Sequence, residues 1–393
     1  MHQTLSSLTH EILDVLDDVT GPEIPKPISL HEPEFSELEK QYVLDCVQSG
    51  WVSSVGAYVD KFEDLLRLKT GAKHAVAVVN GTAALQVCLR LVGVAAGDEV
   101  LVPTLTFVAT ANAVSYQGAI PNFVDSDPLR LSIDPVKLEA YLERIGEVRA
   151  GGLYNKETGR RIAAMVVLHV FGHPADMDVL QAVADRFGIV IVEDAAESLG
   201  STYKGHHAGT LGKIAAVSFN GNKIATSGGG GAILTMDDDL GVRAKHLTTT
   251  ARISAGWEFV HDEVGYNYRM PNLNAALGCA QLERLDDFVA RKRKLAEVYH
   301  LAFDKTSGLN SLREPTDSQS NYWLNAVFAP DRVSRDAVLK ASNDAGYQTR
   351  PCWVPMHLLP MYQNCPRDDL SAAMTAVDRI VNLPSSPRIV GNT

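Results

Sequence analysis

Short apolar runs alternate with segments of helical period from Lys73 onward, and this alternation limits the fold most strongly. The run "HAVAVV" precedes "NGTAALQVCLRLVGV", "DEVLVP" precedes "TFVATANAVSYQG", and "RIAAMVVLHVFG" precedes "DMDVLQAVADRFG". Fully apolar strands separated by amphipathic helices are typical of a parallel sheet that helices cover on both faces. We therefore expect an α/β protein whose large domain has three layers and a mostly parallel central sheet.

The character of the sequence changes at Asn272. Apolar residues then recur three or four positions apart for about thirty residues without a proline, which predicts one long helix capped by Asn272 after Pro271. A strand, "NYWLNAVFAP", and a helix, "SRDAVLKASNDAG", follow it. These patterns predict an N-terminal helical extension and linker (1–29), a large domain (30–271), and a bridging helix with a smaller C-terminal α/β domain (272–393).

Charge and composition argue against several classes of function. The formal net charge of −11 gives no support for binding to nucleic acid or to an anionic membrane. No apolar run reaches the roughly 18 to 20 residues of a transmembrane helix, and the N-terminus lacks the pattern of a secretory signal. The five cysteines are scattered and the twelve histidines lack metal-ligand spacing. We expect reduced thiols, a cytoplasmic protein, no metal, and a polar turn at His206 and His207 in "GHHAG".

Lys223 has an unusual sequence context, because it stands in "SFNGNKIATSGGGGAIL", after a small apolar strand and before four glycines. A nucleotide-binding P-loop needs G-x-x-x-x-G-K-[ST], with the lysine last and a helix behind it. Here the lysine comes first and "GAILTM" is typical of another strand, so the P-loop interpretation fails on order. Lys223 is either a solvated surface lysine or an amine in a semi-buried site, where desolvation favours the nucleophilic free amine.

Three strand ends together describe one ligand. The first leads into a helix whose first turn offers N–H groups to a phosphate, although an ordinary N-cap is the alternative. The second ends in a carboxylate that pairs with a protonated ring nitrogen or caps the next helix. The third brings a hydroxyl and the lysine. A phosphate grip, an acid and a lysine for an aldehyde point to pyridoxal 5′-phosphate. The residues concerned are Gly81, Thr82 and Ala83, then Asp194, then Ser218 and Lys223.

Longer motifs carry a family resemblance. They are "NGTAAL", "VPTLTFVATANAV", "VEDAAESLGSTYKG", "AAVSFNGNKIATSGGGGAIL" and "GYNYRMPNLNAALG". Through them the chain, from about Ile28 to its C-terminus, resembles the sugar aminotransferases of the DegT/DnrJ/EryC1/StrS family. The resemblance implies the fold of type I pyridoxal-phosphate-dependent transferases. Within the family, the chain most resembles the branch that aminates UDP-linked 4-keto-6-deoxy-N-acetyl sugars on the way to bacillosamine or legionaminic acid.

The resemblance implies roles for four residues around the cofactor ring. Lys223 would form the Schiff base with the aldehyde and later move the proton between the amino donor and the cofactor. Asp194 would keep the ring nitrogen protonated, and Phe107 would stack on one face of the ring. Glu197 stands where the family often has a residue that hydrogen-bonds the ring's O3′, a position at which Gln is common.

The resemblance also implies a phosphate site shared between two subunits. Thr82, Ala83 and Ser218 would hold the phosphate from one subunit. Asn267 and Arg269, in "GYNYRM", would reach it from the other. The implied assembly is a homodimer with shared active sites, and the four-glycine run would permit tight backbone next to the lysine loop.

The implied activity is a ping-pong transfer of an amino group from L-glutamate to a nucleotide-linked keto sugar, most closely a UDP-2-acetamido-4-keto-6-deoxy hexose. Relatives that remove a hydroxyl carry histidine in place of the lysine, so Lys223 favours aminotransfer. The cofactor motifs do not separate this acceptor from a 3-keto sugar nucleotide, a dTDP- or GDP-linked 4-keto sugar or a keto-cyclitol. A catalytically idle relative is the alternative from another class, and it predicts purified protein without the absorbance of a lysine Schiff base.

Four residues are candidates for contacts with the sugar nucleotide. The stretch "RPCWVPMHLL" contains Arg350, Trp353 and His357. Packing is the alternative for Trp353, and a helix start is the alternative for His357. His169, in "LHVFG", either lies near the substrate or is a satisfied core histidine.

Overall fold

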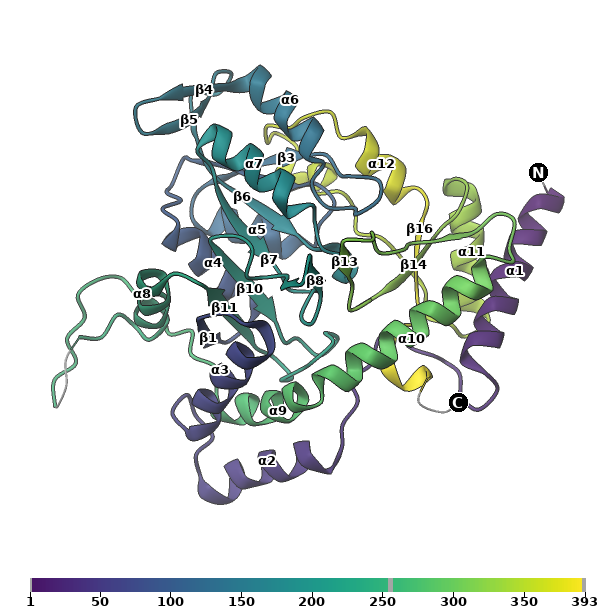
Figure 1. The fold of residues 1–393 in the computed structure, drawn as a ribbon, viewed down its shortest axis with the longest axis horizontal. Coiled ribbons are helices and arrows are strands. Elements are labelled where there is room, and N and C mark those ends of the chain that lie inside the picture. The colour runs from purple at the N-terminus through teal and green to yellow at the C-terminus, as the bar shows by residue number, and fades with distance from the viewer. Residues whose placement is uncertain (1, 254–256, 391–393) are drawn as a thin grey trace.

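The structure is a computed structural model that describes residues 2–253 and 257–390. Its central element is a mixed sheet of nine strands (Figure 1), in which five strands run parallel in the order β10-β7-β6-β2-β3. Strand β11 lies antiparallel between β10 and β1, and a β4–β5 hairpin extends the sheet from β6. The predicted α/β class with a mostly parallel sheet is confirmed. The strands are β1 (His74–Val78), β2 (Glu99–Pro103), β3 (Ile120–Val124), β4 (Gly146–Arg149), β5 (Gly152–Asn155), β6 (Arg161–Leu168), β7 (Val190–Asp194), β10 (Ile214–Ser218) and β11 (Gly231–Thr235).

Helices cover both faces of this sheet because side chains alternate between the faces along each strand and both sets are apolar. In β1, for example, Val76 and Val78 join the core on one face, whereas Ala75 and Ala77 join the core on the other. The first face is covered by α4 (Gly81–Leu91), α5 (Val108–Tyr116) and α8 (Asp238–Thr248). The second is covered by α3 (Ala57–Thr70), α6 (Pro135–Ile145), α7 (Met177–Phe187) and α9 (Asn272–Glu283).

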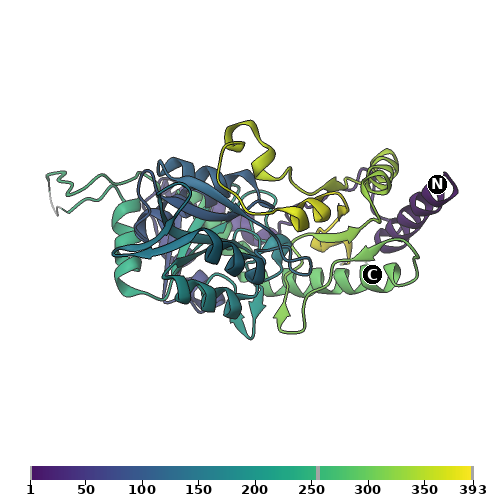
Figure 2. The ribbon, with the colours of Figure 1, turned by 90° about the horizontal axis from the view of Figure 1, so that it is seen from above.

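A second, antiparallel sheet lies beside the first, with the strand order β12-β14-β16-β15. It shares a core with the N-terminal helix α1, in which Leu8, Ile12 and Leu16 are buried together with Leu295 and Tyr299 of α10. Figure 2 shows α1 at one end of the elongated molecule. The elements of this part are α1 (His2–Thr20), α10 (Leu285–Phe303), α11 (Arg332–Asp344), α12 (Ser371–Val377), β12 (Asn310–Ser311), β14 (Asn325–Phe328), β15 (Arg350–Pro351) and β16 (Ile380–Leu383).

Two smaller features connect these parts. A three-stranded sheet joins β13 (Ser318–Gln319) to the hairpin of β8 (Thr202–Tyr203) and β9 (His206–His207). Helix α2 (Glu37–Ser49) packs along α9 and starts with a capping box, in which the Ser36 and Glu39 side chains cap reciprocally. Helix α1 packs with the C-terminal part of the chain. The domain boundaries after residues 29 and 271 stay a prediction.

Two expectations about local structure are wrong. The long helix from Asn272 is interrupted at Arg284 (φ −98°, ψ 1°), which separates α9 from α10, and the apolar periodicity runs through this break without a signal. Asn272 is not the cap either. Pro271 precedes the first turn, and the buried Asn272 side chain accepts from the N–H of Tyr58 (3.0 Å).

The "GHHAG" stretch is a short hairpin strand rather than a simple polar turn. His207 is buried there and accepts a hydrogen bond from the N–H of Gly200 at 2.8 Å. Among the described residues, none of the helices has both the length and the apolar content needed to cross a bilayer.

Candidate active site

The residues singled out at the three strand ends converge on one cavity of about 390 Å³. The cavity lies where β7 and β10 end and where α4 and α5 begin, which is the edge of an α/β sheet at which ligands collect. Two tryptophans from the C-terminal part of the chain, Trp323 and Trp353, also line it. The lining residues are Asn80, Gly81, Thr82, Leu85, Phe107, Ala109, Thr110, Leu168, Asp194, Ala196, Glu197, Ser218, Asn220, Asn222, Lys223, Trp323 and Trp353.

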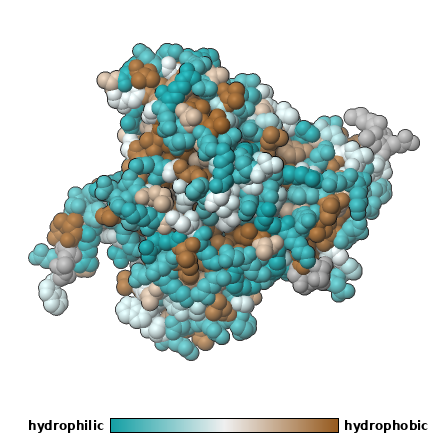
Figure 3. All heavy atoms as spheres, in the orientation of Figure 1, coloured by the Kyte–Doolittle hydropathy of each residue, from teal (hydrophilic) through white to brown (hydrophobic). Residues whose placement is uncertain are grey.

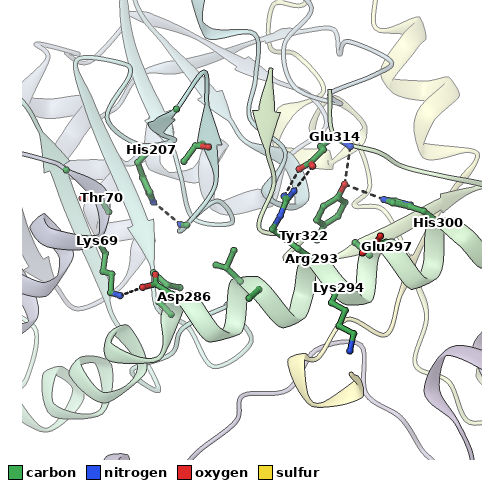
Figure 4. Close-up of a pocket in the computed structure, with 18 residues that line it drawn as sticks. Lys69, Thr70, His207, Asp286, Arg293, Lys294, Glu297, His300, Glu314 and Tyr322 are labelled. Atoms are coloured by element: carbon green, nitrogen blue, oxygen red, sulfur yellow. Dashed lines mark hydrogen bonds and ion pairs between the residues drawn. The ribbon is translucent and has the colours of Figure 1, made fainter. Parts of the chain in front are cut away.

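A larger cavity, about 890 Å³, lies elsewhere along α10 (Figure 4). Several of its charged side chains are already paired with one another, such as Lys69 with Asp286 at 2.7 Å and Arg293 with Glu314 at 2.7 Å. None of the site residues expected from the sequence lines it. The smaller cavity is therefore the candidate active site.

Lys223 lies in the loop between β10 and β11, and its side chain is 13% exposed. Its Nζ stands 3.9 Å from the centre of the Trp323 ring and 3.4 Å from Oε1 of Glu197. The surface-lysine alternative is therefore wrong for this protomer. The amine is held in a largely enclosed, polar-and-aromatic position inside the cavity.

Gly231, the last of the four glycines after Lys223, is required by close backbone approach. A Cβ at Gly231 would lie 2.4 Å from the carbonyl carbon of Asn80, at the start of α4. A Cβ at Gly81 would likewise lie 2.9 Å from the Cβ of Ser218. The lysine loop and the N-terminus of α4 are thus pressed together on one side of the cavity.

Asp194 ends β7 and is almost fully buried. Its Oδ2 accepts the hydroxyl of Thr110 (2.8 Å), and its Oδ1 accepts the N–H of Ala196 (3.2 Å). Burial raises the pKa of Asp194, while these hydrogen bonds and the charge of Lys223 oppose that rise. A cationic ligand group beside Asp194 would further favour the ionised carboxylate.

Glu197 follows in the same loop and is also buried. Its Oε2 accepts the N–H of Phe171, which has a left-handed backbone (φ 55°), at 2.9 Å. Burial raises the pKa of Glu197 to about 7, against the opposing charge of Lys223. The carboxyl can therefore exchange a proton near neutral pH.

The N-terminus of α4 forms an anion cradle together with Ser218. Its first N–H groups have no acceptor within the helix. The N–H of Ala83 donates to Oδ1 of Asn80 (2.8 Å), and the Ala83 side chain is buried. Of the expected phosphate ligands, Thr82 and Ser218 line the cavity together with Gly81, whereas Ala83 does not.

Two aromatic residues expected at the site also line the cavity. Phe107 precedes α5 and is half exposed, at 52%. Trp353 packs on Phe171, with ring centres 5.3 Å apart. Both present ring surface to a ligand.

The other residues expected at the site lie outside this cavity. Buried His169 bonds Oε2 of Glu193 through Nε2 (2.9 Å), and its Nδ1 accepts the N–H of Ala175 (3.1 Å), so the core-histidine alternative accounts for it. His357 bonds the Thr104 hydroxyl through Nδ1 (2.8 Å).

Arg350 is exposed on β15 and donates to Oδ1 of Asn343 (2.9 Å), away from the cavity. Asn267 is exposed, and Arg269 lines a separate cavity of about 310 Å³. Neither of these two lines the cavity that holds Lys223.

Sequence reasoning missed two residues of the site. Trp323 stands under the lysine amine, but its stretch is typical of an ordinary core strand. Thr110 supports Asp194 from the first turn of α5, within the quoted "TFVAT", so its place at a helix start was a usable signal.

Comparison with known proteins agrees with the fold. Residues 33–393 match the family described as the DegT/DnrJ/EryC1/StrS aminotransferase family. A GDP-perosamine synthase of Escherichia coli O157:H7 is 37% identical over 93% of this chain and 94% of its own. A UDP-2-acetamido-2-deoxy-3-oxo-D-glucuronate aminotransferase of Pseudomonas aeruginosa is 33% identical over 85% and 87%. The crystal structure of the aminotransferase TlmJ from Streptoalloteichus hindustanus superposes with a TM-score of 0.82, at 30% identity over 91% and 93% of the chains.

Proposed function

The chain belongs to the DegT/DnrJ/EryC1/StrS aminotransferase family, whose cofactor is pyridoxal 5′-phosphate, and we propose that it moves the amino group of L-glutamate to a nucleotide-linked keto sugar. The observation that supports this most directly is the convergence of Lys223, Asp194 and the N-terminus of α4 on one cavity. Its volume of about 390 Å³ suits a small ligand, because such sites measure roughly 300 to 1,000 Å³.

The donor set fits the cofactor group by group. Pyridoxal 5′-phosphate, when bound, supplies an aldehyde that accepts amino groups and a ring that delocalises electrons. The N–H groups at Gly81 and Thr82 and the Ser218 hydroxyl would bind the phosphate at the positive end of α4. The Asp194 carboxylate would hold a proton on the ring nitrogen, and Phe107 would cover one ring face.

Lys223 would transfer the proton. Its Nζ would bond the aldehyde at rest, and the freed amine would take the Cα proton of glutamate and deliver it to the cofactor carbon. The same steps in reverse would place the amino group on the keto sugar. Glu197, when protonated, would donate a hydrogen bond to the ring hydroxyl oxygen.

We also propose a homodimer in which Asn267 and Arg269 complete the partner's phosphate site. Both lie at the base of an arm (residues 251–253 and 257–266) that projects beyond α8 (Figure 1). Figure 3 shows hydrophobic residues at the surface of this arm. Trp257 and Phe259 in it are 100% and 73% exposed. Such apolar exposure on a projecting segment is typical of a protein interface.

Two acceptors are candidates. The relatives named GDP-perosamine synthase, at 34 to 37% identity, favour a GDP-linked 4-keto sugar. The motif resemblance favours a UDP-2-acetamido-4-keto-6-deoxy hexose. The relative named for a UDP-linked 3-oxo-glucuronate makes 3-keto sugar nucleotides a further acceptor to test.

An amine-transfer assay separates these acceptors. Glutamate is supplied with GDP-, UDP- and dTDP-linked 4-keto sugars, with and without a 2-acetamido group, and with 3-keto analogues, and 2-oxoglutarate is measured. We expect turnover with one nucleotide class and none in Lys223→Ala. Lys213→Ala is the matched control, because Lys213 is half exposed and paired with Asp237 outside the cavity. Absence of turnover with every member contradicts the proposal.

A further inference from the structure

The free amine of Lys223 occupies a defined position in the structure. Its Nζ lies over the face of Trp323, 3.9 Å from the ring centre, and 3.4 Å from the carboxylate oxygen of Glu197. An ammonium over an indole face is attracted by the ring quadrupole, and this attraction grows when water is excluded. A neutral amine lacks the charge on which this attraction depends.

Trp323 is held rigidly in this position. Its Nε1 donates to the carbonyl of Asn222, the residue before Lys223, at 2.7 Å. Its backbone N–H donates to Oδ1 of Asn321 (2.7 Å), and its carbonyl accepts from Nζ of Lys292 (3.0 Å). The indole is therefore locked to the same loop that carries the reactive lysine.

Glu197 is held by the same neighbours. Nδ2 of Asn321 donates to the carbonyl of Glu197 at 2.9 Å, while Phe171 fixes Oε2. Asn321 thus bonds the backbone of both residues whose side chains flank the amine. Two independent chain segments, one after β7 and one before β14, meet at the lysine through this asparagine.

We propose that Trp323 and Glu197 form a resting position for the ammonium of Lys223, occupied whenever the lysine has taken a proton and is not bonded to an aldehyde. The proposal rests on the proposed function only in assigning Lys223 the proton transfer. The proton that leaves a substrate carbon goes to Nζ, the ammonium is stabilised between ring and carboxylate, and the proton returns from Nζ to carbon. Trp323 is on this account a further residue of the catalytic machinery.

Other titratable groups face Lys223, but they do not provide this position. The Asp194 carboxylate is engaged by Thr110 and Ala196. His31, from the segment before α2, has its pKa lowered well below the usual value by burial and by the charges of Lys292 and Lys223, so it stays neutral.

The reaction of the Lys223 amine with acetic anhydride tests the proposal. Full-length protein is first treated with hydroxylamine and dialysed to free Lys223 from any aldehyde. Labelling of the Lys223 peptide is then measured against pH by mass spectrometry. Removing the ring with Trp323→Leu should move the pH midpoint of labelling down by about 0.5 to 1 unit, which is the cation–π contribution expressed as a pH shift. Glu197→Gln should also move it down.

Matched variants separate this effect from simple opening of the cavity. Trp353→Leu removes a tryptophan from the same cavity and should leave the midpoint unchanged, and Trp323→Phe should keep part of the shift and the fold. Greater access raises the limiting rate at high pH without moving the midpoint. The proposal is overturned if Trp323→Leu changes only the limiting rate, or moves the midpoint no more than Trp353→Leu does.

The labelling result is independent of cofactor binding. A midpoint shift in protein that binds no pyridoxal 5′-phosphate would support the resting position and contradict the proposed function. Cofactor binding and amine transfer without a midpoint shift would support the function and overturn the resting position.

Discussion

Thr110, in the first turn of α5, donates its hydroxyl to Oδ2 of Asp194 at 2.8 Å. This hydrogen bond lowers the pKa of Asp194, against burial, which raises it. The hydroxyl of a neighbouring helix thus favours the ionised form of this carboxylate, although burial prevails and leaves the pKa of Asp194 raised.

Thr110→Val should weaken this support without changing shape. We expect affinity for pyridoxal 5′-phosphate to fall about 10- to 150-fold, since a hydrogen bond to a charged group contributes about 1.5 to 3 kcal/mol. The dissociation constant is measured by spectroscopic titration. Thr375→Val, at an exposed position of α12, is the control and should bind as the wild type does. Equal affinities of the two variants would refute the role of Thr110.

Glu197 should make the stability of the cofactor-free chain depend on pH. Its pKa rises from 4.5 to about 7 on folding, mainly through burial, so the folded state binds more protons than the unfolded state between these values. The free energy of unfolding therefore falls as pH rises from 4.5 to about 7, by up to about 3 kcal/mol for this group.

The difference in unfolding free energy between the wild type and Glu197→Gln isolates this contribution, because the contributions of the other titrating groups cancel. Urea unfolding at pH 5 and pH 8 should give the wild type a relative loss of stability at the higher pH. Glu37→Gln, an exposed change, should give no such difference. If the difference in unfolding free energy between the wild type and Glu197→Gln does not vary with pH, Glu197 titrates normally.

Gly172→Ala should destabilise the site. Gly172 has φ +96°, and a Cβ there would lie 1.9 Å from Oδ1 of Asn321. We expect a loss of about 3 kcal/mol from left-handed strain and overpacking together. Gly188→Ala is the matched control, because its φ is +67° and nothing lies within 4 Å, so strain alone should cost about 1 kcal/mol. Comparable losses in unfolding free energy would contradict the close contact with Asn321.

The fold was largely predictable because its signals are local. Apolar strands and amphipathic helices alternate, and several helices begin or end with a recognisable residue, such as the Asn80 cap of α4. The break at Arg284 was not predictable, because apolar spacing continues through it. The packing of α1 against α10 joins segments that are almost 300 residues apart, which no local pattern reports.

The site was predictable where its residues sit at strand ends, since the ends of parallel strands share one edge of the sheet. Gly81, Asp194 and Lys223 meet for this reason. Nearness in sequence was a poor guide elsewhere. Arg350 and Trp353 are three residues apart, yet only Trp353 lines the cavity.

The proposed homodimer with shared active sites predicts complementation between two inactive variants. Lys223→Ala lacks the amine, and Arg269→Ala should lack the partner's phosphate contact. In a mixed dimer, the site that keeps Lys223 receives Arg269 from the other subunit. After denaturation and refolding of an equal mixture, about a quarter of wild-type activity should return, because half of the dimers are mixed and each has one intact site. No recovery, with both variants folded and dimeric, would place Arg269 outside the partner's site.

Borohydride reduction followed by peptide mass spectrometry tests the role of Lys223 most directly. Full-length protein loaded with pyridoxal 5′-phosphate is reduced and digested, and the lysine that carries the phosphopyridoxyl group is identified. We predict modification at Lys223, none in Lys223→Ala, and no change of site in Lys213→Ala. Modification of a different lysine, or of none, would contradict the assignment of Lys223 as the amine that bonds the cofactor.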